Sequence, residues 1–463
     1  MKPYWSYPAS DLATLVQSGR ATAVEIAQST LERIAQVNGS LNAIVQCDPE
    51  RVLVEAAAVD AMDVVTRTGL PLAGVPVTIK VTADQVGYAT THGLRSKVDN
   101  ISDYDSPSVR NMKDAGAVVV GRTNTPAFSY RWFTSNQLHG RTRNPHLSRI
   151  TAGGSSGGAA SAVAAGMGAI AHGTDIAGSV RYPAYACGVH GLRPTPGRIP
   201  AFNRTSPSRP IGQQMMGVTG PLARTIADLE LALQVMSVAG HDDPLWVPAP
   251  LAGSPVAKRA AFCRAPDGMA VEPEVAAEVE AAALSLASAG WEVEEIQATP
   301  PLREASELHV YLWMGDGYEA KLREALAEGD TGAITALQGQ AHRGRELDGA
   351  RFSQVLRRRY ELMCLWQECF ARYAVLLLPV SGALPFEEDR DIRSVADYQY
   401  VWDAQSPLIG TAFVGIPGLA CATRPSDGVP NGVQVLAGRF REDLCIAAGK
   451  DIEKALSAVQ CVI

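Results

Sequence analysis

The order of hydrophobic and polar residues predicts that the chain begins with helices. Ser10 stands where an N-cap residue would begin a short helix. Thr22 and Glu25 have the spacing of a capping box, which predicts a second helix after them. A third helix is expected near residues 51–66, so residues 1–66 are interpreted as a helical N-terminal segment.

Beyond this segment, short apolar runs alternate with stretches of helical periodicity. The apolar and β-branched runs predict strands at residues 75–80, 118–120, 169–171, 260–263, 375–378 and 433–436. Helices are predicted after Ser106, at residues 226–238 and 273–289, and from about Arg441. This alternation predicts an α/β fold, with a central mixed and twisted sheet covered by helices on both faces.

One long stretch of the chain differs from the rest in its amino-acid composition. Residues 300–373 are rich in Glu, Arg and Leu and have a helical pattern, which indicates a helical insertion or lobe beside the sheet. The chain contains no internal repeat and no Ser-, Gly- or Pro-rich linker. Residues 1–463 are therefore expected to form a single domain.

Composition and charge exclude several classes of protein. With 46% hydrophobic and 19% charged residues, the chain is not disordered. Its net charge of 41 − 48 = −7 gives no basic footprint for nucleic acid. Its apolar runs are far shorter than the ~20 residues that span a bilayer, so we expect a cytoplasmic protein without membrane contact. The 8 cysteines and 8 histidines lack zinc-site spacing, and no metal or other cofactor is expected.

The glycines of the chain are concentrated around serines in two short clusters. Residues 153–158 read GGSSGG, and residues 173–179 read GTDIAGS. Small residues in a turn allow several backbone N–H groups to point at one position, as an oxyanion requires. A phosphate-binding loop is disfavoured because neither a Gly-Lys-Ser/Thr ending nor GxGxxG spacing is present. A purely structural turn remains the alternative for either cluster.

A nucleophilic serine needs a base, and the residues alone leave its identity open. There is no GxSxG motif around either cluster. His172 and His190 flank the second cluster, but packing or hydrogen bonding accounts for them equally well. Lys80 ends an apolar strand, where burial would lower its pKa and make it a base. A lysine at a strand end is nevertheless more often exposed to solvent.

Several motifs together resemble those of the amidase signature family. The two serine clusters are followed by Arg181, Pro183 and the segment 187–198, CGVHGLRPTPGR. The supporting matches are residues 74–80 (GVPVTIK), 121–126 (GRTNTP), 134–136 (TSN), 143–145 (RNP), 415–419 (GIPGL) and 428–434 (GVPNGVQ). The resemblance covers nearly the whole chain and implies the amidase signature fold and amide hydrolysis.

The resemblance also implies roles for individual residues. Ser179 corresponds to the nucleophile that forms an acyl-enzyme, Ser155 to a bridging serine after a cis peptide bond, and Lys80 to the base. Ser156, Asp175 and Arg181 would support this triad. The oxyanion hole would consist of the backbone N–H groups of Ile176, Ala177, Gly178 and Ser179.

Two positions depart from the family pattern. Val81 replaces the usual Asp after the lysine, and Ala177 replaces the first of two usual glycines before the nucleophile. Neither change removes a member of the triad. The methyl group of Ala177 leads us to expect a narrowed or redirected oxyanion hole, with an effect on substrate range.

The resemblance leaves two functions open. One is a free-standing hydrolase of small amides, including aryl or apolar amides, anilides and carbamates; the other is the glutaminase-type subunit of a tRNA-dependent amidotransferase complex. The aromatic residues of segment 309–318 favour the hydrolase. Tyr130, Trp132, Phe133 and Trp313 are the candidate pocket residues, with aromatic core packing as the alternative for Tyr130, Trp132 and Phe133. The expected partner is a small-molecule amide, and the oligomeric state stays open between a monomer and a homodimer.

Overall fold

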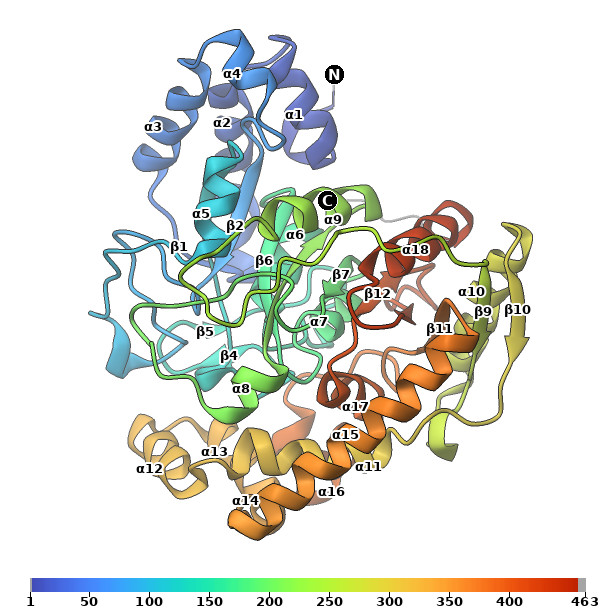
Figure 1. The fold of residues 1–463 in the computed structure, drawn as a ribbon. Helices are drawn as coiled ribbons and strands as arrows, with labels where there is room; N and C mark the ends of the chain where they lie inside the picture. Colours follow the sequence, from blue (N-terminus) through green and yellow to red (C-terminus); the bar gives the residue numbers. More distant parts are fainter. Residues whose placement is uncertain (1, 457–463) are drawn as a thin grey trace.

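A mixed sheet of 11 strands forms the centre of the molecule (Figure 1). The computed structural model describes residues 2–456 of the chain. From edge to edge the strands are β1 (Ile44–Gln46), β3 (Val118–Thr123), β2 (Pro76–Lys80), β6 (Ile170–Asp175), β8 (Val218–Ala223), β7 (His190–Arg193), β12 (Gly418–Ala422), β13 (Gly432–Leu436), β11 (Val375–Pro379), β9 (Arg259–Phe262) and β10 (Glu292–Glu295). The predicted α/β class with a mixed sheet is confirmed.

Strand direction brings together residues that are far apart in the sequence. β2 pairs in parallel with both β3 and β6. Thr78 of β2 lies opposite Ala171 of β6, so Lys80 at the end of β2 lies beside the last residues of β6. The carboxyl ends of adjacent parallel strands are the usual place for a site in an α/β sheet.

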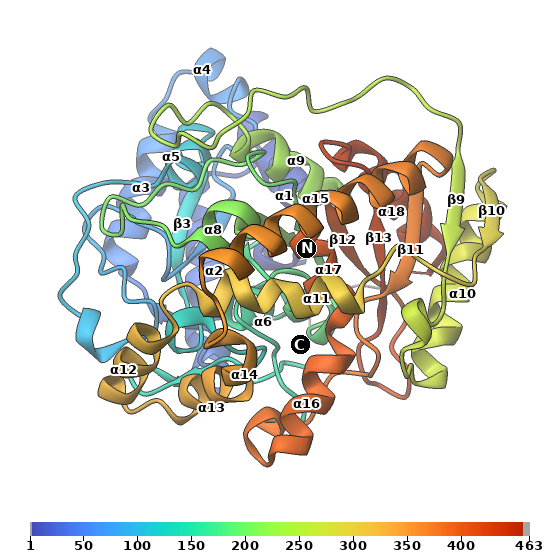
Figure 2. The ribbon, with the colours of Figure 1, turned by 60° about the horizontal axis from the view of Figure 1, so that its bottom comes forward.

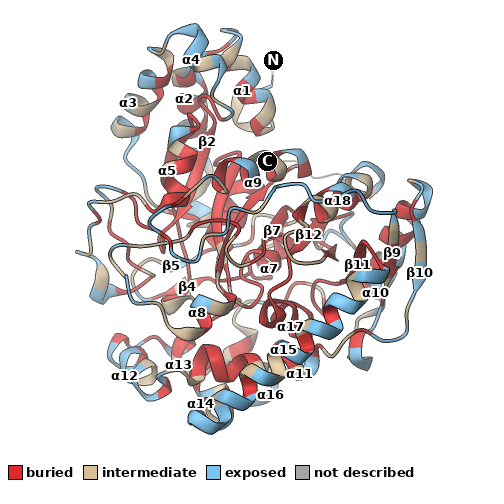
Figure 3. Ribbon diagram, in the orientation of Figure 1, coloured by how far each residue is buried: buried red, intermediate tan, exposed pale blue. Residues whose placement is uncertain are grey.

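Alternate residues of the strands enter two different hydrophobic cores. In β11, Val375 and Leu377 pack in one core, whereas Leu376 lies in the other. Side chains alternate between the two faces of a strand, so the two cores lie on opposite faces of the sheet. Inner strands such as β2, β3, β8 and β11 are accordingly buried along their whole length, whereas the edge strand β10 is largely exposed (Figure 3).

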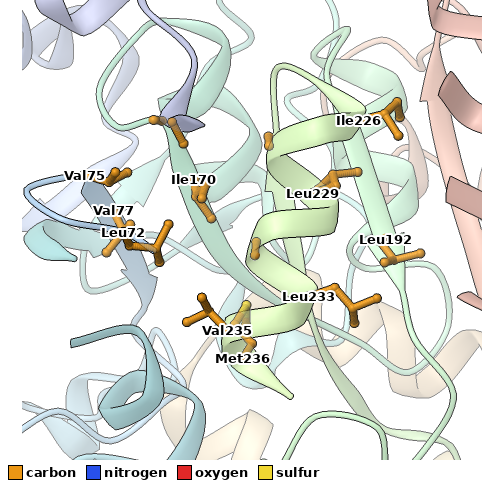
Figure 4. Close-up of a cluster of buried hydrophobic side chains, with 14 of the residues drawn as sticks. Leu72, Val75, Val77, Ile170, Leu192, Ile226, Leu229, Leu233, Val235 and Met236 are labelled. Carbon is orange, nitrogen blue, oxygen red and sulfur yellow. The ribbon is translucent and has the colours of Figure 1, made fainter. Parts of the chain in front are cut away.

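One face of the sheet is covered by helices from both ends of the chain. The helices of this first core are α1 (Ala9–Gln17), α2 (Ala23–Leu41), α3 (Pro49–Asp60), α5 (Pro107–Asp114), α9 (Ile226–Met236), α10 (Pro273–Ser288) and α18 (Glu442–Leu456). The close-up in Figure 4 shows α9 in this core, where its Leu229 and Leu233 lie near Ile170 and Leu192 of the strands. The apolar side chains of this core include none of the predicted site residues.

The second core contains the helices that follow the serine clusters, those of residues 300–373 and the two helices that come after β11. They are α6 (Gly157–Ala164), α7 (Arg181–Ala186), α8 (Ile211–Met216), α11 (Arg303–Val310), the π-helical segment η5 (Tyr311–Gly315), α12 (Tyr318–Glu328), α13 (Thr331–Gly339), α15 (Gly349–Arg372), α16 (Val395–Ala404) and α17 (Ser406–Val414). The short α14 (Ala341–Gly344) lies beside η5. Residues 300–373 are helical, as their pattern predicts, and lie together with α16 in Figure 2.

Several short elements complete the described chain. A separate hairpin consists of β4 (Ser135–Asn136) and β5 (Gly140–Arg141). The 3-10 turns are η1 (Tyr4–Ser6), η2 (Arg95–Lys97), η3 (Ala127–Ser129), η4 (Pro266–Gly268) and η6 (Arg390–Ile392). Within residues 2–456 no helix is both long enough and apolar enough to cross a membrane.

Of the two N-caps predicted for the N-terminal helices, one forms and the other does not. The capping box forms, since Thr22 Oγ1 accepts the N–H of Glu25 at 3.1 Å and the Glu25 carboxylate accepts the N–H of Thr22 at 2.8 Å. Ser10 is not a cap, because α1 already begins at Ala9. The N–H groups of Ala9 and Ser10 donate instead to the carboxylate of Asp228 in α9, at 2.9 and 3.0 Å.

The predicted third helix is two helices in the structure. α3 ends at Asp60, and α4 (Val64–Thr68) begins after Asp63, whose carboxylate accepts the N–H groups of Val65 and Thr66. Asp63 is a strong N-cap residue that starts a new helix in the middle of the predicted one. All four N-terminal helices lie together at the top of Figure 1.

Candidate active site

The ammonium-bearing end of Lys80 lies in a cluster of hydroxyl groups at the carboxyl end of β2. Its Nζ is 2.7 Å from Oγ of Ser155, 3.1 Å from Oγ of Ser156 and 2.9 Å from Oγ1 of Thr174. The Lys80 side chain is 0% exposed. Thr174 was not among the predicted site residues, although it stands inside the second serine cluster.

Burial changes the acid–base behaviour of this lysine. Desolvation lowers the pKa of Lys80 to about 7, against the opposing attraction of the Asp175 carboxylate. A neutral amine has two N–H donors and one lone pair, so one of the hydroxyl groups around Nζ must then donate to it. The Ser156 hydroxyl is directed at the carbonyl oxygen of Thr174, 3.3 Å away, which leaves the hydroxyls of Ser155 and Thr174 available as donors to the amine. The geometry therefore permits a proton to pass between Ser155 and Lys80.

Glycines allow the first serine cluster to fold into this narrow space. The peptide bond between Gly154 and Ser155 is cis, as the resemblance implies. Gly153 has a φ of +77°, and a Cβ atom there would lie 2.6 Å from Cα of Pro183. A Cβ atom on Gly154 would lie 2.5 Å from the carbonyl oxygen of Arg131. Only glycine fits this close approach of two backbones.

Ser179 reaches the same place from the end of β6. Its carbonyl oxygen accepts the N–H of Ser156 at 3.2 Å, which ties the two serine clusters together. The residue before it, Gly178, has a φ of +100°, and a Cβ atom there would lie 2.7 Å from Cδ1 of Leu408. The hydroxyl of Ser179 has no hydrogen-bond partner among residues 2–456. It lies on the wall of a cavity that Ser155 also lines.

A fully buried ion cluster holds the turn between β6 and Ser179. The Asp175 carboxylate accepts Nε of Arg181 at 2.9 Å and Nη1 of Arg193 at 3.2 Å. Burial by itself raises the pKa of Asp175, but the charges of Arg181 and Arg193 outweigh it and hold the pKa well below its usual range. Asp175 and Arg181 thus contact the turn and not the hydroxyl cluster, whereas Arg193 was absent from the predicted set.

The backbone of this turn corrects one predicted oxyanion donor. The N–H of Gly178 donates to the Asp175 carboxylate at 2.8 Å, so it is not free to bind an anion. The N–H groups of Ile176, Ala177 and Ser179 have no acceptor in the described part of the chain. Buried N–H groups without a partner are unfavourable. These successive donors beside Ser179 therefore fit an anion such as a tetrahedral oxyanion.

The two residues that depart from the family pattern, Val81 and Ala177, are both buried but have different neighbours. Val81 is fully buried, and its N–H donates to the carbonyl oxygen of Thr123 at 3.1 Å. The methyl group of Ala177 is buried in the second core and is not on the cavity wall. The structure therefore gives no support to the expectation that this methyl group narrows the site.

The cavity beside the serines has a volume of about 980 Å³ and one aromatic wall. Phe128 and Tyr130 stack with ring centroids 5.3 Å apart, and Trp313 meets Tyr130 edge-on at 6.1 Å. These residues line the cavity together with Ile176. Charged residues of both signs line it elsewhere: Lys97, Arg209, Lys321, Asp316, Glu324 and Glu328.

Two of the predicted pocket residues belong to the core instead. Trp132 is 6% exposed and packs edge-on against Trp402, and Phe133 is 0% exposed and stacks on Phe386. Neither lines the cavity. The path of this segment turns Trp132 and Phe133 away from the wall that carries Tyr130, and a short aromatic run does not reveal which members face inward.

The histidines beside the second cluster do not contact either serine. His172 lies on the cavity wall, but its Nε2 is 3.3 Å from Oγ of Ser108, and burial lowers its pKa to about 3. Nδ1 of His190 accepts the N–H of Ala422, away from the cavity. His309, which sequence reasoning did not single out, does contact the turn: its Nε2 is 2.8 Å from the carbonyl oxygen of Ile176.

Known proteins resemble this chain along most of its length. The family model described as Amidase matches residues 25–446. An indoleacetamide hydrolase of Bradyrhizobium diazoefficiens is 39% identical over 460 residues, which cover 97% of this chain and 87% of that protein. A glutamyl-tRNA(Gln) amidotransferase subunit of Koribacter versatilis is 31% identical over 477 residues, with 96% and 97% coverage.

A solved structure of a known enzyme has the same fold as this chain. The structure of a bacterial aryl acylamidase belonging to the amidase signature enzymes superposes with a TM-score of 0.84. The match covers 98% of this chain and 97% of that one, at 26% sequence identity. The sheet and the helices on both of its faces are therefore shared with that enzyme.

Proposed function

The chain belongs to the amidase family of amide C–N hydrolases, and we propose that it hydrolyses small aryl or arylalkyl carboxamides through an acyl-enzyme on Ser179. One observation carries the proposal. A buried lysine with a pKa of about 7 is hydrogen-bonded to Ser155, and Ser155 lines the same cavity as the free hydroxyl of Ser179.

In the first half of the proposed reaction, Ser179 replaces the amine of the substrate. Oγ of Ser179 forms a bond to the amide carbon while its proton passes to Ser155, and the Ser155 proton passes to neutral Lys80. The same protons return through Ser155 to the nitrogen of the substrate as the C–N bond breaks. An amide nitrogen leaves only when it is protonated, which is why a relay that works in both directions is needed.

In the second half, water removes the acyl group. A water molecule loses a proton through the same relay and attacks the acyl carbon, the bond to Oγ breaks, and Ser179 recovers its proton. The products are a carboxylic acid and an amine or ammonia. In both halves the charge on the carbonyl oxygen is assigned to the N–H groups of Ile176, Ala177 and Ser179, without that of Gly178.

The aromatic wall supports an aryl group on the substrate. Phe128, Tyr130 and Trp313 present stacked and edge-on rings to the cavity, and such rings favour flat apolar groups. One relative is named an indoleacetamide hydrolase, and the substrate in that name is an arylacetamide. Indoleacetamide is therefore the first substrate to test, followed by phenylacetamide, an anilide and an aryl carbamate.

The test uses the purified chain alone and measures the amine or ammonia that each substrate releases. We expect release from arylacetamides by the wild type and none above background from Ser179→Ala, with both proteins giving the same circular dichroism spectrum. Rapid quenching and mass spectrometry should detect the acyl group on Ser179. Hydrolysis by Ser179→Ala at the wild-type rate would exclude this nucleophile.

The amidotransferase function is the second candidate, because a relative of that kind is 31% identical along nearly the whole chain. Glutamine must therefore be in the panel. Ammonia release from glutamine only, and only after addition of a partner protein, would favour this second function. Hydrolysis of arylacetamides by the isolated chain would exclude the need for a partner.

A further inference from the structure

Every backbone carbonyl of the turn between β6 and Ser179 accepts a hydrogen bond. Nη1 of Arg193 donates to the carbonyl of Asp175 at 2.6 Å, and the N–H of Tyr182 donates to that of Gly178 at 2.7 Å. The carbonyls between them are held by side chains from distant segments. These are Nε2 of His309 on the oxygen of Ile176 at 2.8 Å and Nε1 of Trp132 on the oxygen of Ala177 at 2.9 Å.

Each of these bonds also determines where an N–H group points. The C=O and N–H groups of a trans peptide lie in one plane and point in opposite directions. The carbonyl of Ile176 shares its peptide with the N–H of Ala177, which has no acceptor among the described residues. The carbonyl of Ala177 shares its peptide with the N–H of Gly178, which donates to the Asp175 carboxylate at 2.8 Å. His309 therefore fixes the peptide whose N–H, that of Ala177, is free. Trp132 fixes the next peptide, whose N–H, that of Gly178, is already bonded to Asp175.

His309 is a fixed donor in this position. Its side chain is 0% exposed, and burial lowers the pKa of its imidazole to about 4, so the ring is neutral near pH 7. A carbonyl oxygen only accepts hydrogen bonds, which places the proton of the neutral ring on Nε2. Nδ1 is buried without a partner among the described residues. The edge-on ring of Trp313, with its centroid 5.4 Å away, limits rotation of the imidazole.

We propose that His309 is a positioning residue that aims the N–H of Ala177 at the oxyanion formed on the substrate carbonyl. This inference rests on the proposed function of Ser179 and adds a residue to it. His309 lies in the last turn of α11, and Trp313 stands four residues later in η5, on the aromatic wall of the cavity. One helical segment thus provides a wall residue of the cavity, Trp313, and the side chain that fixes a peptide of the anion site, His309.

The test compares His309→Leu, which removes the donor, with His309→Gln, which keeps a neutral N–H donor at a similar reach. We expect His309→Leu to lower kcat for an arylacetamide by about 10- to 100-fold, a fraction of what losing an oxyanion donor costs. KM should stay within about twofold because the bond is not made to the ground-state substrate. His309→Gln should recover most of kcat.

A fluorophosphonate probe gives a second readout that needs no known substrate. Oγ of Ser179 forms a bond to phosphorus, the P–F bond breaks, fluoride leaves and the serine proton passes to the base. The phosphoryl oxygen carries the developing charge, so the labelling rate, followed by mass spectrometry, should fall in His309→Leu by the same factor as kcat.

Trp132→Phe is the matched control. It removes a donor of the same kind from the next carbonyl of the same turn, where the N–H of the peptide is already bonded to Asp175. We expect a lower unfolding temperature but a labelling rate within about threefold of wild type, since no anion donor is released.

The outcomes separate this inference from the proposed function. A labelling rate that falls in His309→Leu, recovers in His309→Gln and persists in Trp132→Phe supports the positioning role. Equal losses in His309→Leu and Trp132→Phe, or no loss in either, would overturn it. A wild type that is labelled at Ser179 but hydrolyses no amide would contradict the proposed function and leave the labelling comparison intact as a test of His309.

Discussion

At the scale of single residues, the ionisation of Lys80 decides whether the candidate site can work. Burial brings its pKa to about 7, so a substantial fraction of the amine is neutral near neutral pH. A general base is most effective when its pKa lies near the working pH. The hydroxyl of Ser155 at 2.7 Å is the group through which this base would act.

The first prediction concerns the pH dependence of this lysine. In the proposed reaction the neutral amine is the active form, and its fraction rises with pH, so log kcat/KM for an arylacetamide should rise with a slope of about 1 below pH 7 and level off above it. Steady-state rates from pH 5 to 9 check this, about two units on either side of the expected pKa. Lys80→Ala should show no such rise and no activity above background.

Glu388 provides the control for this profile. Burial raises the pKa of its carboxyl to about 7 as well, but the residue is not on the cavity wall. Glu388→Gln should therefore leave the inflection in place. An inflection that disappears in Glu388→Gln would contradict the assignment to Lys80.

The second prediction concerns Asp175, whose charge is shared by two buried guanidinium groups. Asp175→Asn leaves Arg181 and Arg193 without their carboxylate, and breaking a buried ion pair costs about 3–5 kcal/mol of unfolding free energy. Urea denaturation measures this loss. The exposed ion pair of Lys450 and Glu230 serves as the control. Glu230→Gln should change the urea midpoint of unfolding only slightly.

The same substitution should move the pH profile in a known direction. The negative charge of Asp175 raises the pKa of Lys80. Its removal in Asp175→Asn should lower that pKa further, so the inflection of any residual activity shifts to lower pH. A shift to higher pH would show that Asp175 acts on Lys80 in some other way.

At the scale of elements, caps from distant helices replace caps that the local sequence lacks. α1 begins after Pro8, which has no side-chain group to accept its first N–H groups. Asp228 of α9 accepts two of them, and Thr225 meanwhile caps α9 itself through the N–H of Asp228. A carboxylate is favourable at the N-terminus of a helix because of the helix dipole. One residue therefore joins the N-terminal helices to the helix that covers the centre of the sheet.

The third prediction follows from this contact. Asp228→Ala should lower the unfolding free energy by about 1–2 kcal/mol, the usual cost of a lost cap. Hydrogen exchange followed by mass spectrometry should show the largest loss of protection in Ala9–Gln17. Thr22→Ala, which removes a cap within its own helix, should increase exchange in Ala23–Leu41 instead. Uniform exchange changes in both variants would contradict a local role.

At the scale of the whole molecule, segments from three regions of the chain meet at one cavity. Phe128 and Tyr130 come from the segment before the first serine cluster, and Trp313 comes from the helical segment 300–373. The hydroxyl cluster lies where parallel strands β2 and β6 end. The rings and the hydroxyl cluster are thus held by the sheet and by the helices packed in its second core.

The fourth prediction tests the aromatic wall. Trp313→Ala should raise KM for indoleacetamide by about 10-fold or more through lost ring contact, whereas KM for acetamide should change little. Any fall in kcat through the freed ring of His309 should be the same for both substrates. Phe133→Leu is the control, because Phe133 is buried in the core and lines no part of the cavity. Equal changes in KM for both substrates in Trp313→Ala would argue against aryl recognition by this wall.

The sequence by itself determined the features that depend on near neighbours. The capping box of Thr22 and Glu25, the apolar strand before Lys80 and the glycine clusters around Ser155 and Ser179 can all be identified from short patterns. Periodicity, cap residues and small-residue turns act over a few positions, so their physical causes lie inside the pattern. Polar strands such as β10, with the sequence EVEE, gave no such signal because an edge strand need not be apolar.

Only the tertiary structure decided which distant groups meet. Nothing near Ile176 indicates that His309 donates to its carbonyl, and nothing near Ala9 indicates that Asp228 caps α1. These contacts span 133 and 219 positions and depend on the order of strands and the packing of helices. Short patterns could therefore single out the candidate residues, whereas the contacts of each donor required the path of the whole chain.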